Sequence, residues 1–257
     1  MAIHPTAIVE PGAQVDPSCE IGPFALVGPH VVLGPRTSVA AHAVVTGHTT
    51  LGAGNRVFSF AVIGGVPQDL KYRGEPTRLE VGDGNTFREY VTVNTGTVGG
   101  GGVTRIRNGC LLMASSHVGH DCDVGDGAII ANSVALAGHV TVEEHVHLGG
   151  LAAVHQFCRI GRLSFVSGLT GVTMDVAPYT MVAGARAELG GLNLVGLQRA
   201  GMTEDQVGRV KQAFKVLFRS GLPAAEAVAQ LEAELGAHPE IAHLVAFAKS
   251  SKRGLTR

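Results

Sequence analysis

The sequence predicts a mainly β fold, a parallel β-solenoid of triangular cross-section with a helical domain at its C-terminal end. Aliphatic residues recur at a step of six over most of the chain. Glycine is abundant, with 36 residues among 257, while aromatic residues make up only 5%, which suits many tight turns around a narrow aliphatic core. Helix start and stop signals gather in residues 191–257.

The six-residue repeat is the strongest of these signals. Its runs of aliphatic or Phe anchors cover residues 3–63, 81–93 and 106–172. A step of six fits neither a helix nor an alternating strand, but it fits a flat side made of one short strand and one turn. Three sides then form a coil of roughly 18 residues, with the anchors inside and neighbouring coils about 4.8 Å apart.

Two segments interrupt the repeat and are expected to loop out of the solenoid. Residues 67–80 are polar and carry no anchor, and residues 96–105 contain the run Gly99 to Gly102. A glycine run can cradle phosphate, although it is more often a flexible connection. The solenoid with its loops is expected to span residues 1–190, and the helical domain residues 191–257.

The C-terminal segment contains the start and stop signals of three helices. Thr203 and Gln206 form a capping-box pattern at the start of the first, and Gly221 marks its end. A second helix is expected after Pro223 and a third after His238. These helices would cap the open end of the solenoid.

Composition and charge exclude several classes of protein. The net charge of -1 argues against a nucleic-acid binder driven by charge. No apolar run is long enough for membrane insertion, and residues 1–5 lack a secretory signal pattern. The four cysteines have no C-x-x-C spacing and are expected to be reduced, which indicates a cytoplasmic protein.

Four histidines are expected to gather on one part of the solenoid. His120, His139 and His155 follow one another at roughly the length of one coil, and His117 shares the coil of His120. Ordinary turn or surface positions are the alternative. A neutral histidine can take the proton from a sugar hydroxyl, as acyl transfer requires, and Asp121 could orient the ring of His120.

The same region offers a donor for an oxyanion. Gly138 directly precedes His139, and glycine allows a backbone N–H to approach a tetrahedral intermediate closely. No G-x-S-x-G motif is present, so no covalent acyl-enzyme needs to be invoked.

Longer motifs resemble one family of hexapeptide-repeat enzymes. They are Ile21-Gly22-Pro23-Phe24, Gln68-Asp69-Leu70-Lys71-Tyr72, Gly74-Glu75-Pro76-Thr77-Arg78, His117-Val118-Gly119-His120-Asp121-Cys122, Leu136-Ala137-Gly138-His139-Val140 and Val154-His155-Gln156-Phe157-Cys158. Over nearly the whole chain, the sequence resembles the UDP-N-acetylglucosamine 3-O-acyltransferases that begin lipid A synthesis. The resemblance implies a left-handed β-helix, whereas general crossover rules favour the opposite hand.

The resemblance also implies roles for single residues. His120 would be the general base, Asp121 its partner and Gly138 the oxyanion donor. The residues implied to bind substrate are Gln68, Asp69, Lys71, His117, His139, His155, Gln156, Gly168, Asn193 and Arg199.

Two of these assignments carry further expectations. A glycine at position 168, which limits acyl-chain length in the family, would leave room for a longer chain. Asn193 and Arg199 match nucleotide-binding positions. The chain departs from the family at Val195 and Ala200, where a glutamate and a second arginine are usual, so contacts to the nucleotide are expected to differ.

The implied substrates are UDP-N-acetylglucosamine and a 3-hydroxyacyl group on acyl carrier protein, used by a homotrimer without cofactor or metal. Acyl carrier protein is acidic, and a basic helical surface would attract it, although a solvated helix face is the ordinary interpretation. The basic residues concerned are Lys211, Lys215, Arg219, Lys249, Lys252 and Arg253.

Three alternatives remain at this point. One is another hexapeptide sugar N-acyltransferase, against which the 68–72 and 117–122 motifs argue. Another is a zinc enzyme of the hexapeptide-repeat carbonic anhydrase type, in which histidines at subunit boundaries bind the metal. Against it, the only H-x4-H spacing is His238 and His243 in the helical tail. The third is a non-catalytic scaffold.

Overall fold

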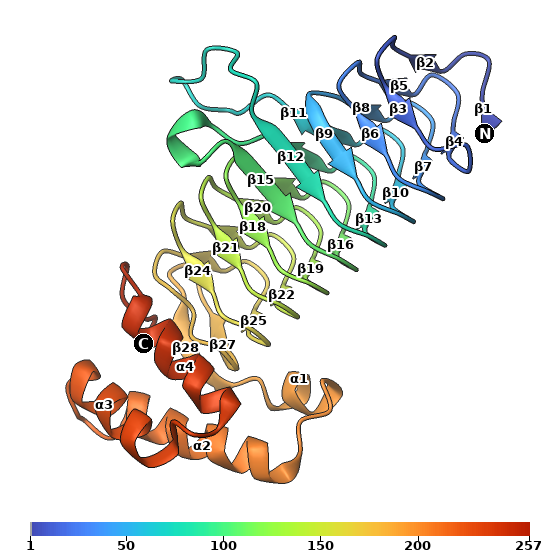
Figure 1. The fold of residues 1–257 in the computed structure, drawn as a ribbon. Coiled ribbons are helices and arrows are strands. Elements are labelled where there is room, and N and C mark those ends of the chain that lie inside the picture. The colour runs from blue at the N-terminus through green and yellow to red at the C-terminus, as the bar shows by residue number, and fades with distance from the viewer. Residues whose placement is uncertain (1) are drawn as a thin grey trace.

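The computed structural model describes residues 2–257, which form a left-handed parallel β-helix capped by helices (Figure 1). Up to β26, strands pair with the third strand before and after them, and β27 and β28 then extend one sheet beyond β25, so the strands stack into three sheets, named here A, B and C. Pairing is parallel throughout, except between the last two strands of sheet A. The predicted fold class is therefore confirmed.

Sheet A contains β1 (Ala2–Ile3), β4 (Glu20–Ile21), β7 (Ser38–Val39), β10 (Arg56–Val57), β13 (Thr86–Phe87), β16 (Leu111–Leu112), β19 (Ile129–Ile130), β22 (His147–Leu148), β25 (Phe165–Val166), β27 (Thr180–Ala183) and β28 (Glu188–Leu192). Sheet B contains β2 (Ile8–Val9), β5 (Leu26–Val27), β8 (Val44–Val45), β11 (Val62–Gly65), β14 (Thr92–Asn94), β17 (His117–Val118), β20 (Ala135–Leu136), β23 (Ala153–Val154) and β26 (Gly171–Val172). Sheet C contains β3 (Gln14–Val15), β6 (Val32–Leu33), β9 (His48–Leu51), β12 (Arg78–Val81), β15 (Val103–Ile106), β18 (Asp123–Val124), β21 (Thr141–Val142) and β24 (Arg159–Ile160).

The anchors of the repeat form the core. Val27, Leu112, Leu136 and Ile160 are among those that are fully or almost fully buried. Each follows an outward-facing residue in its strand, because side chains alternate along a strand. A second buried side chain, two positions before the anchor, completes the core on most flat sides, as at Ala25, Val134 and Cys158.

The three corners of the prism are β-turns with a common pattern. The turn closes between the first corner residue and the residue three positions on, as in the bond of 2.9 Å from Ala7 N–H to the His4 carbonyl. Proline occupies the second corner position at six successive corners, from Pro5 to Pro35, because the amide there has no backbone acceptor in the described chain. At most corners from Phe24 to Tyr179, a non-glycine residue at the third position has φ between 55° and 70°, as a type II turn requires, whereas Thr6, Ser18 and His30 at the same position do not.

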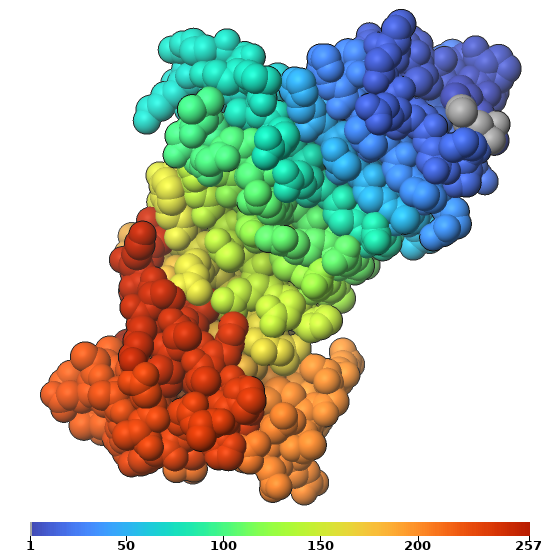
Figure 2. All heavy atoms as spheres, in the orientation of Figure 1, coloured from blue at the N-terminus to red at the C-terminus, as the bar shows by residue number. Residues whose placement is uncertain are grey.

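Both loops leave the prism at one corner, between sheets B and C. The first connects β11 to β12, and the second connects β14 to β15 through the short 3₁₀ helix η1 (Val98–Gly100). Strand β12 starts at Arg78 and β15 at Val103, so the last residues of both predicted loops belong to sheet C. Figure 2 shows the two loops projecting together from the N-terminal half of the molecule, in cyan and green.

The tail contains four helices, α1 (Leu194–Arg199), α2 (Glu204–Arg219), α3 (Ala224–Leu235) and α4 (Pro239–Ser250). The capping box between Thr203 and Gln206 is present, with both of its hydrogen bonds. The short helix α1 was not predicted. Among residues 2–257, none of the helices combines the length and apolar character that crossing a bilayer demands.

An ionic cluster joins the helical tail to sheet C. Glu143 Oε2 lies 2.8 Å from His243 Nε2 on α4 and accepts the Arg162 N–H at 2.9 Å. Arg159 pairs with Glu143 at 3.4 Å and lies over the ring of Phe247 on α4. Burial alone would raise the pKa of Glu143, but the hydrogen bonds from His243 and Arg162 hold it below its usual value.

We predict that Glu143→Gln lowers the stability of the folded protein by about 1–3 kcal/mol at neutral pH, because a buried charged hydrogen-bond acceptor is lost. A depressed carboxyl pKa contributes stability above the unfolded value of about 4.3, and this contribution disappears as pH falls through the folded pKa. The melting temperatures of wild type and Glu143→Gln should therefore differ at pH ~7 and converge in acid. The more exposed Glu144→Gln is the matched control, and equal melting temperatures of wild type and Glu143→Gln at neutral pH would contradict this account.

Candidate active site

The four predicted histidines lie along the corner between sheets B and C. His117 is the outward residue of β17, and its Nδ1 lies 2.7 Å from the hydroxyl of Thr92 on the preceding coil. His120, His139 and His155 occupy the second, third and first positions of three successive corner turns. They therefore share one edge of the prism, although each starts from a different position in its turn.

Asp121 is the hub of this corner. Its side chain is only 1% exposed, and Oδ2 lies 2.7 Å from Nδ1 of His120. Thr97, in the loop after β14, donates its N–H to Oδ1 at 2.8 Å and its hydroxyl to Oδ2 at 2.6 Å. The Asp121 N–H donates to the hydroxyl of Thr104 at 2.8 Å. The hydrogen bonds from Thr97 fix the Asp121 carboxylate in one orientation. The carboxylate in turn holds the ring of His120 with Nδ1 directed towards Oδ2.

The glycine run of the second loop covers the Asp121 carboxylate. Gly100 packs so closely on the Asp121 carboxylate that a Cβ at that position would collide with it. Gly101 and Gly102 have φ of 95° and 79°, which favour glycine. The run therefore closes the corner over Asp121, a role that neither sequence interpretation anticipated.

Gly138 lies directly against the ring of His120. A Cβ at Gly138 would come within 2.6 Å of His120 Nε2, so only glycine admits the ring in this position. Gly138 holds the second corner position, and its N–H makes no hydrogen bond in the described chain. A free N–H donor and an unpaired ring nitrogen thus stand side by side, as an oxyanion site and a base require.

His139 forms the wall next to this pair. Its ring meets that of His120 edge-on, with centroids 5.0 Å apart, and stacks on Phe157 at 4.3 Å. Burial lowers the pKa of His139 even though the Asp121 carboxylate opposes the shift. Burial, followed by the nearby His120, also lowers the pKa of His117. Both rings are therefore neutral near pH 7 and add no positive charge beside His120.

A cavity of about 330 Å³ opens beside the corner, under the first loop. Asp69 and Lys71 of that loop line it opposite His139 and Phe157, together with the loop residues Tyr72, Glu75, Thr97, Val98 and Gly99. The Lys71 N–H donates to Asp69 Oδ1 at 2.9 Å, which fixes the turn of the loop. The cavity thus places an acid and a base from the loop within reach of the histidine corner.

Other predicted residues lie outside this cavity. Gln68 is exposed on the loop, and His155 and Gln156 are exposed on the turn of Phe157. His155 Nδ1 lies 3.1 Å from the carbonyl of Gln156. Gly168 lies at the corner between sheets A and B, across the whole width of sheet B from His120.

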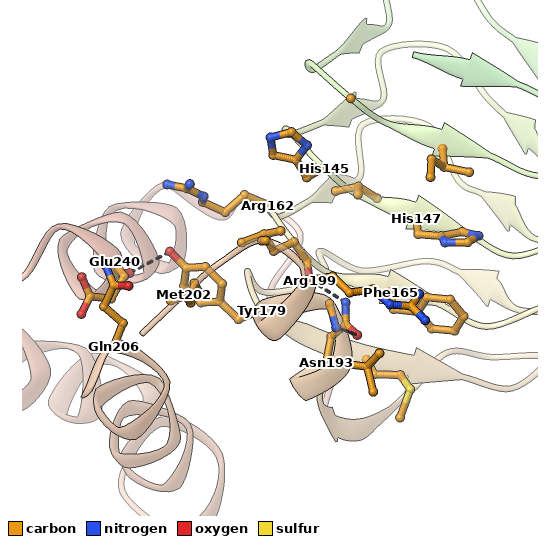
Figure 3. Close-up of a pocket in the computed structure, with 18 of the residues that line it drawn as sticks. His145, His147, Arg162, Phe165, Tyr179, Asn193, Arg199, Met202, Gln206 and Glu240 are labelled. Atoms are coloured by element: carbon orange, nitrogen blue, oxygen red, sulfur yellow. Dashed lines mark hydrogen bonds between the residues drawn. The ribbon is translucent and has the colours of Figure 1, made fainter. Parts of the chain in front are cut away.

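Asn193 and Arg199 line a separate cavity of about 900 Å³ between sheet A and the helical tail. Asn193 is the N-cap of α1, where Oδ1 accepts the Gly196 N–H at 3.1 Å and Nδ2 donates to the Leu163 carbonyl at 2.9 Å. Figure 3 shows Asn193, Arg199, Phe165 and His147 converging on this cavity. Within one chain, the implied substrate residues that line cavities therefore form two half-sites, one with Asp69, Lys71 and His139 and the other with Asn193 and Arg199.

Among residues 2–257, one group of side chains could hold a metal ion. Ligand atoms of His120, Asp121 and His139 lie within 4.8 Å of one another. However, Asp121 Oδ2 already accepts from His120 and from Thr97, which leaves it little capacity for a metal. His243 of the H-x4-H pair is bound to Glu143. The geometry favours a base with an orienting carboxylate.

Sequence reasoning missed Thr97, Thr104 and Phe157. Phe157 could have been found, because it falls at the same turn position as Asp121 and His139 in successive coils. Nothing in the sequence around Thr97 signals that its loop folds back over Asp121.

Comparisons with known proteins agree with this architecture. A family model described as UDP N-acetylglucosamine O-acyltransferase, domain 2, matches residues 175–256, and a bacterial transferase hexapeptide model matches residues 104–138. A protein of Anaeromyxobacter sp. (strain Fw109-5), named acyl-acyl-carrier-protein–UDP-N-acetylglucosamine O-acyltransferase, is 72% identical over the full length of both chains. A protein of the same name from Myxococcus xanthus (strain DK1622) is 53% identical over 211 residues, 82% of each chain.

Solved structures give the same result. LpxA of Acinetobacter baumannii superposes with a TM-score of 0.97 at 40% identity, over 100% of both chains. The UDP-N-acetylglucosamine O-acyltransferase of Moraxella catarrhalis RH4 superposes with a TM-score of 0.97 at 43% identity, also over 100% of both chains. This chain belongs to the UDP-N-acetylglucosamine O-acyltransferase family.

Proposed function

We propose that this protein transfers a 3-hydroxyacyl group from acyl carrier protein to the 3-hydroxyl of UDP-N-acetylglucosamine, the first step of lipid A synthesis. The observation that carries the proposal is the contact between His120, oriented by Asp121, and Gly138 with its free N–H. The identity of 72% with a full-length O-acyltransferase supports oxygen as the acceptor atom, ahead of an N-acyltransferase or a zinc enzyme.

His120 is the general base in this proposal. A carboxylate can only accept, so Nδ1–H of His120 donates to Asp121 and Nε2 is free to take the proton of the sugar hydroxyl. The hydroxyl oxygen attacks the thioester carbonyl, and the Gly138 N–H donates to the oxyanion. When the tetrahedral intermediate collapses, the C–S bond breaks and the imidazolium returns the proton to the leaving thiolate. No cofactor is needed, because base and oxyanion donor both come from the chain.

The acyl chain has a path along sheet B. The outward residues that follow His117 in register are Ala135, Ala153 and Gly171, one on each successive coil. Because these side chains are small, we infer that an acyl chain can lie over them, along sheet B and away from His120. Gly168, exposed next to the far end of this path, would then limit chain length. Asp69, Lys71 and His139, with the exposed Gln68, His155 and Gln156 around them, bind the polar part of the substrates in this proposal.

A homotrimer would join the two half-sites. Outward residues of sheet B are uncharged from β2 to β26, and those of the last coils of sheet A are mostly apolar, as at Ile129, Phe165 and Met181. Sheet C instead carries ion pairs such as Arg105–Glu80 at 3.2 Å. We infer that sheet B of one protomer faces sheet A of the next around a threefold axis, which brings Asn193 and Arg199 to the neighbour's His120.

Helix α2 offers the surface for acyl carrier protein. Lys211, Lys215 and Arg219 are exposed at steps of four, which places them on one face of the helix. By contrast, Lys249 pairs with Glu232 at 2.6 Å, and Arg253 donates to the Thr173 carbonyl. The α2 stripe is therefore the part of the predicted basic surface best suited to an acidic partner. The four free cysteines fit the reducing cytoplasm, where we place the enzyme.

The proposed base makes the first prediction for activity. His120→Asn should lower kcat by about 100-fold to 10,000-fold, because proton removal loses its acceptor. The assay measures acylated UDP-N-acetylglucosamine by mass spectrometry, with 3-hydroxyacyl carrier proteins of several chain lengths as donors. His30→Asn is the matched control, since His30 lies on the same prism edge several coils away, stacked on His48. Substantial turnover by His120→Asn would remove His120 from this role, and no product from wild type would reject the proposed reaction.

The shared site makes a second prediction. His120→Asn and Arg199→Ala damage different half-sites, so each variant alone should have low activity. Co-expressed with two affinity tags and purified as mixed trimers, they should regain about a third of wild-type activity, because one of the three interfaces in every mixed trimer pairs two intact halves. Activity no higher than the sum of the two separate variants would place both halves of the site in one chain.

A further inference from the structure

Two basic side chains in the cavity beside α1 have no hydrogen-bond or ion-pair partner within residues 2–257. His147 projects outward from β22 and Arg199 from the last turn of α1, and both line the cavity. Neither side chain makes a hydrogen bond or ion pair within residues 2–257. Val195 and Gly196 of α1 and its C-cap residue Ala200 also line the cavity and carry no charge.

The other charged groups of the cavity are already neutralised. Arg162 pairs with Glu144 at 3.2 Å, and Glu240 pairs with Arg209 at 2.6 Å. The complete set of titratable residues that line the cavity is His145, His147, Arg162, Tyr179, Arg199 and Glu240. Only His147 and Arg199 therefore remain available to an anion, apart from the exposed corner residue His145.

The position of His147 couples its charge to Arg199. Burial, followed by the positive charge of Arg199, lowers the pKa of His147, so the ring is neutral in the free protein near pH 7. An anion between the two groups would reverse this effect, because it screens Arg199 and stabilises the imidazolium. The ring of Phe165 packs against His147 with centroids 5.1 Å apart, which holds the imidazole in the cavity (Figure 3).

We propose that His147 and Arg199 together bind the diphosphate of the nucleotide sugar, and that His147 takes up a proton as the diphosphate enters. A diphosphate diester carries two negative charges, and Arg199 alone supplies one positive charge. With uncharged residues at 195 and 200, His147 on sheet A is placed to supply a second positive charge from the same chain. The inference rests on the proposed function, because it assumes a nucleotide sugar in this cavity.

The test measures proton uptake during binding. UDP-N-acetylglucosamine is titrated into the wild-type protein in a calorimeter at pH ~7.5, once in each of two buffers that differ in ionisation enthalpy. Its diphosphate is fully ionised there, so any proton taken up goes to the protein. The wild-type protein should take up close to about one proton per bound nucleotide sugar. His147→Gln, which keeps a hydrogen-bond donor but cannot be charged, should take up almost none and bind about tenfold more weakly.

Two further variants make the outcome specific. His147→Phe keeps the ring packing on Phe165 and should behave like His147→Gln if charge is the cause. His30→Gln, which lies on the first coils away from this cavity and stacks on His48, should match wild type in both readouts. Unchanged affinity and proton uptake in His147→Gln overturn the assignment. Failure of the wild-type protein to bind UDP-N-acetylglucosamine overturns the proposed function itself, and the assignment with it.

Discussion

The register between coils is the constraint on which the rest of the molecule depends. Parallel pairing aligns each residue with the one directly above it on the next coil, as His117 aligns with Ala135, Ala153 and Gly171. Buried anchors fix this register, because a slip of one residue would turn the aliphatic side chains outwards. The register therefore brings residues that are distant in the chain to the same corner, and their own side-chain contacts are not needed to do so.

The chemistry of the site grows out of the ordinary geometry of these corners. The residue at the second position of a turn has an N–H without a backbone acceptor, so proline, which has no N–H, fits this position along the first coils. At Gly138 the same free N–H lies beside the ring of His120. Two loops leave at this corner and nowhere else among the described residues, and the second of them brings Thr97 and Gly100 onto Asp121. The candidate active site therefore lies at the corner where the two loops interrupt the regular coils.

Much of this arrangement was predictable from the sequence. The six-residue step gave the solenoid, and coil spacing brought His120 and His139 to one corner, while the capping box located α2. The loop contact of Thr97 with Asp121 was not predictable, because it depends on how a glycine-rich segment folds back in three dimensions. Gly168 and Arg199 lie on other faces than His120, so sequence spacing within one chain cannot relate them to it. The helix α1 has only six residues, too few for a periodic signal.

The central claim is that Asp121, held by Thr97 and Thr104, orients His120 so that Nε2 acts as the base. Single-turnover acyl transfer by Asp121→Asn tests this most directly, because the asparagine keeps the shape of the side chain and removes its charge. The account predicts that the rate of the chemical step falls by about 100-fold or more while the affinity for UDP-N-acetylglucosamine stays near that of wild type. A chemical step as fast as in the wild-type protein would contradict it.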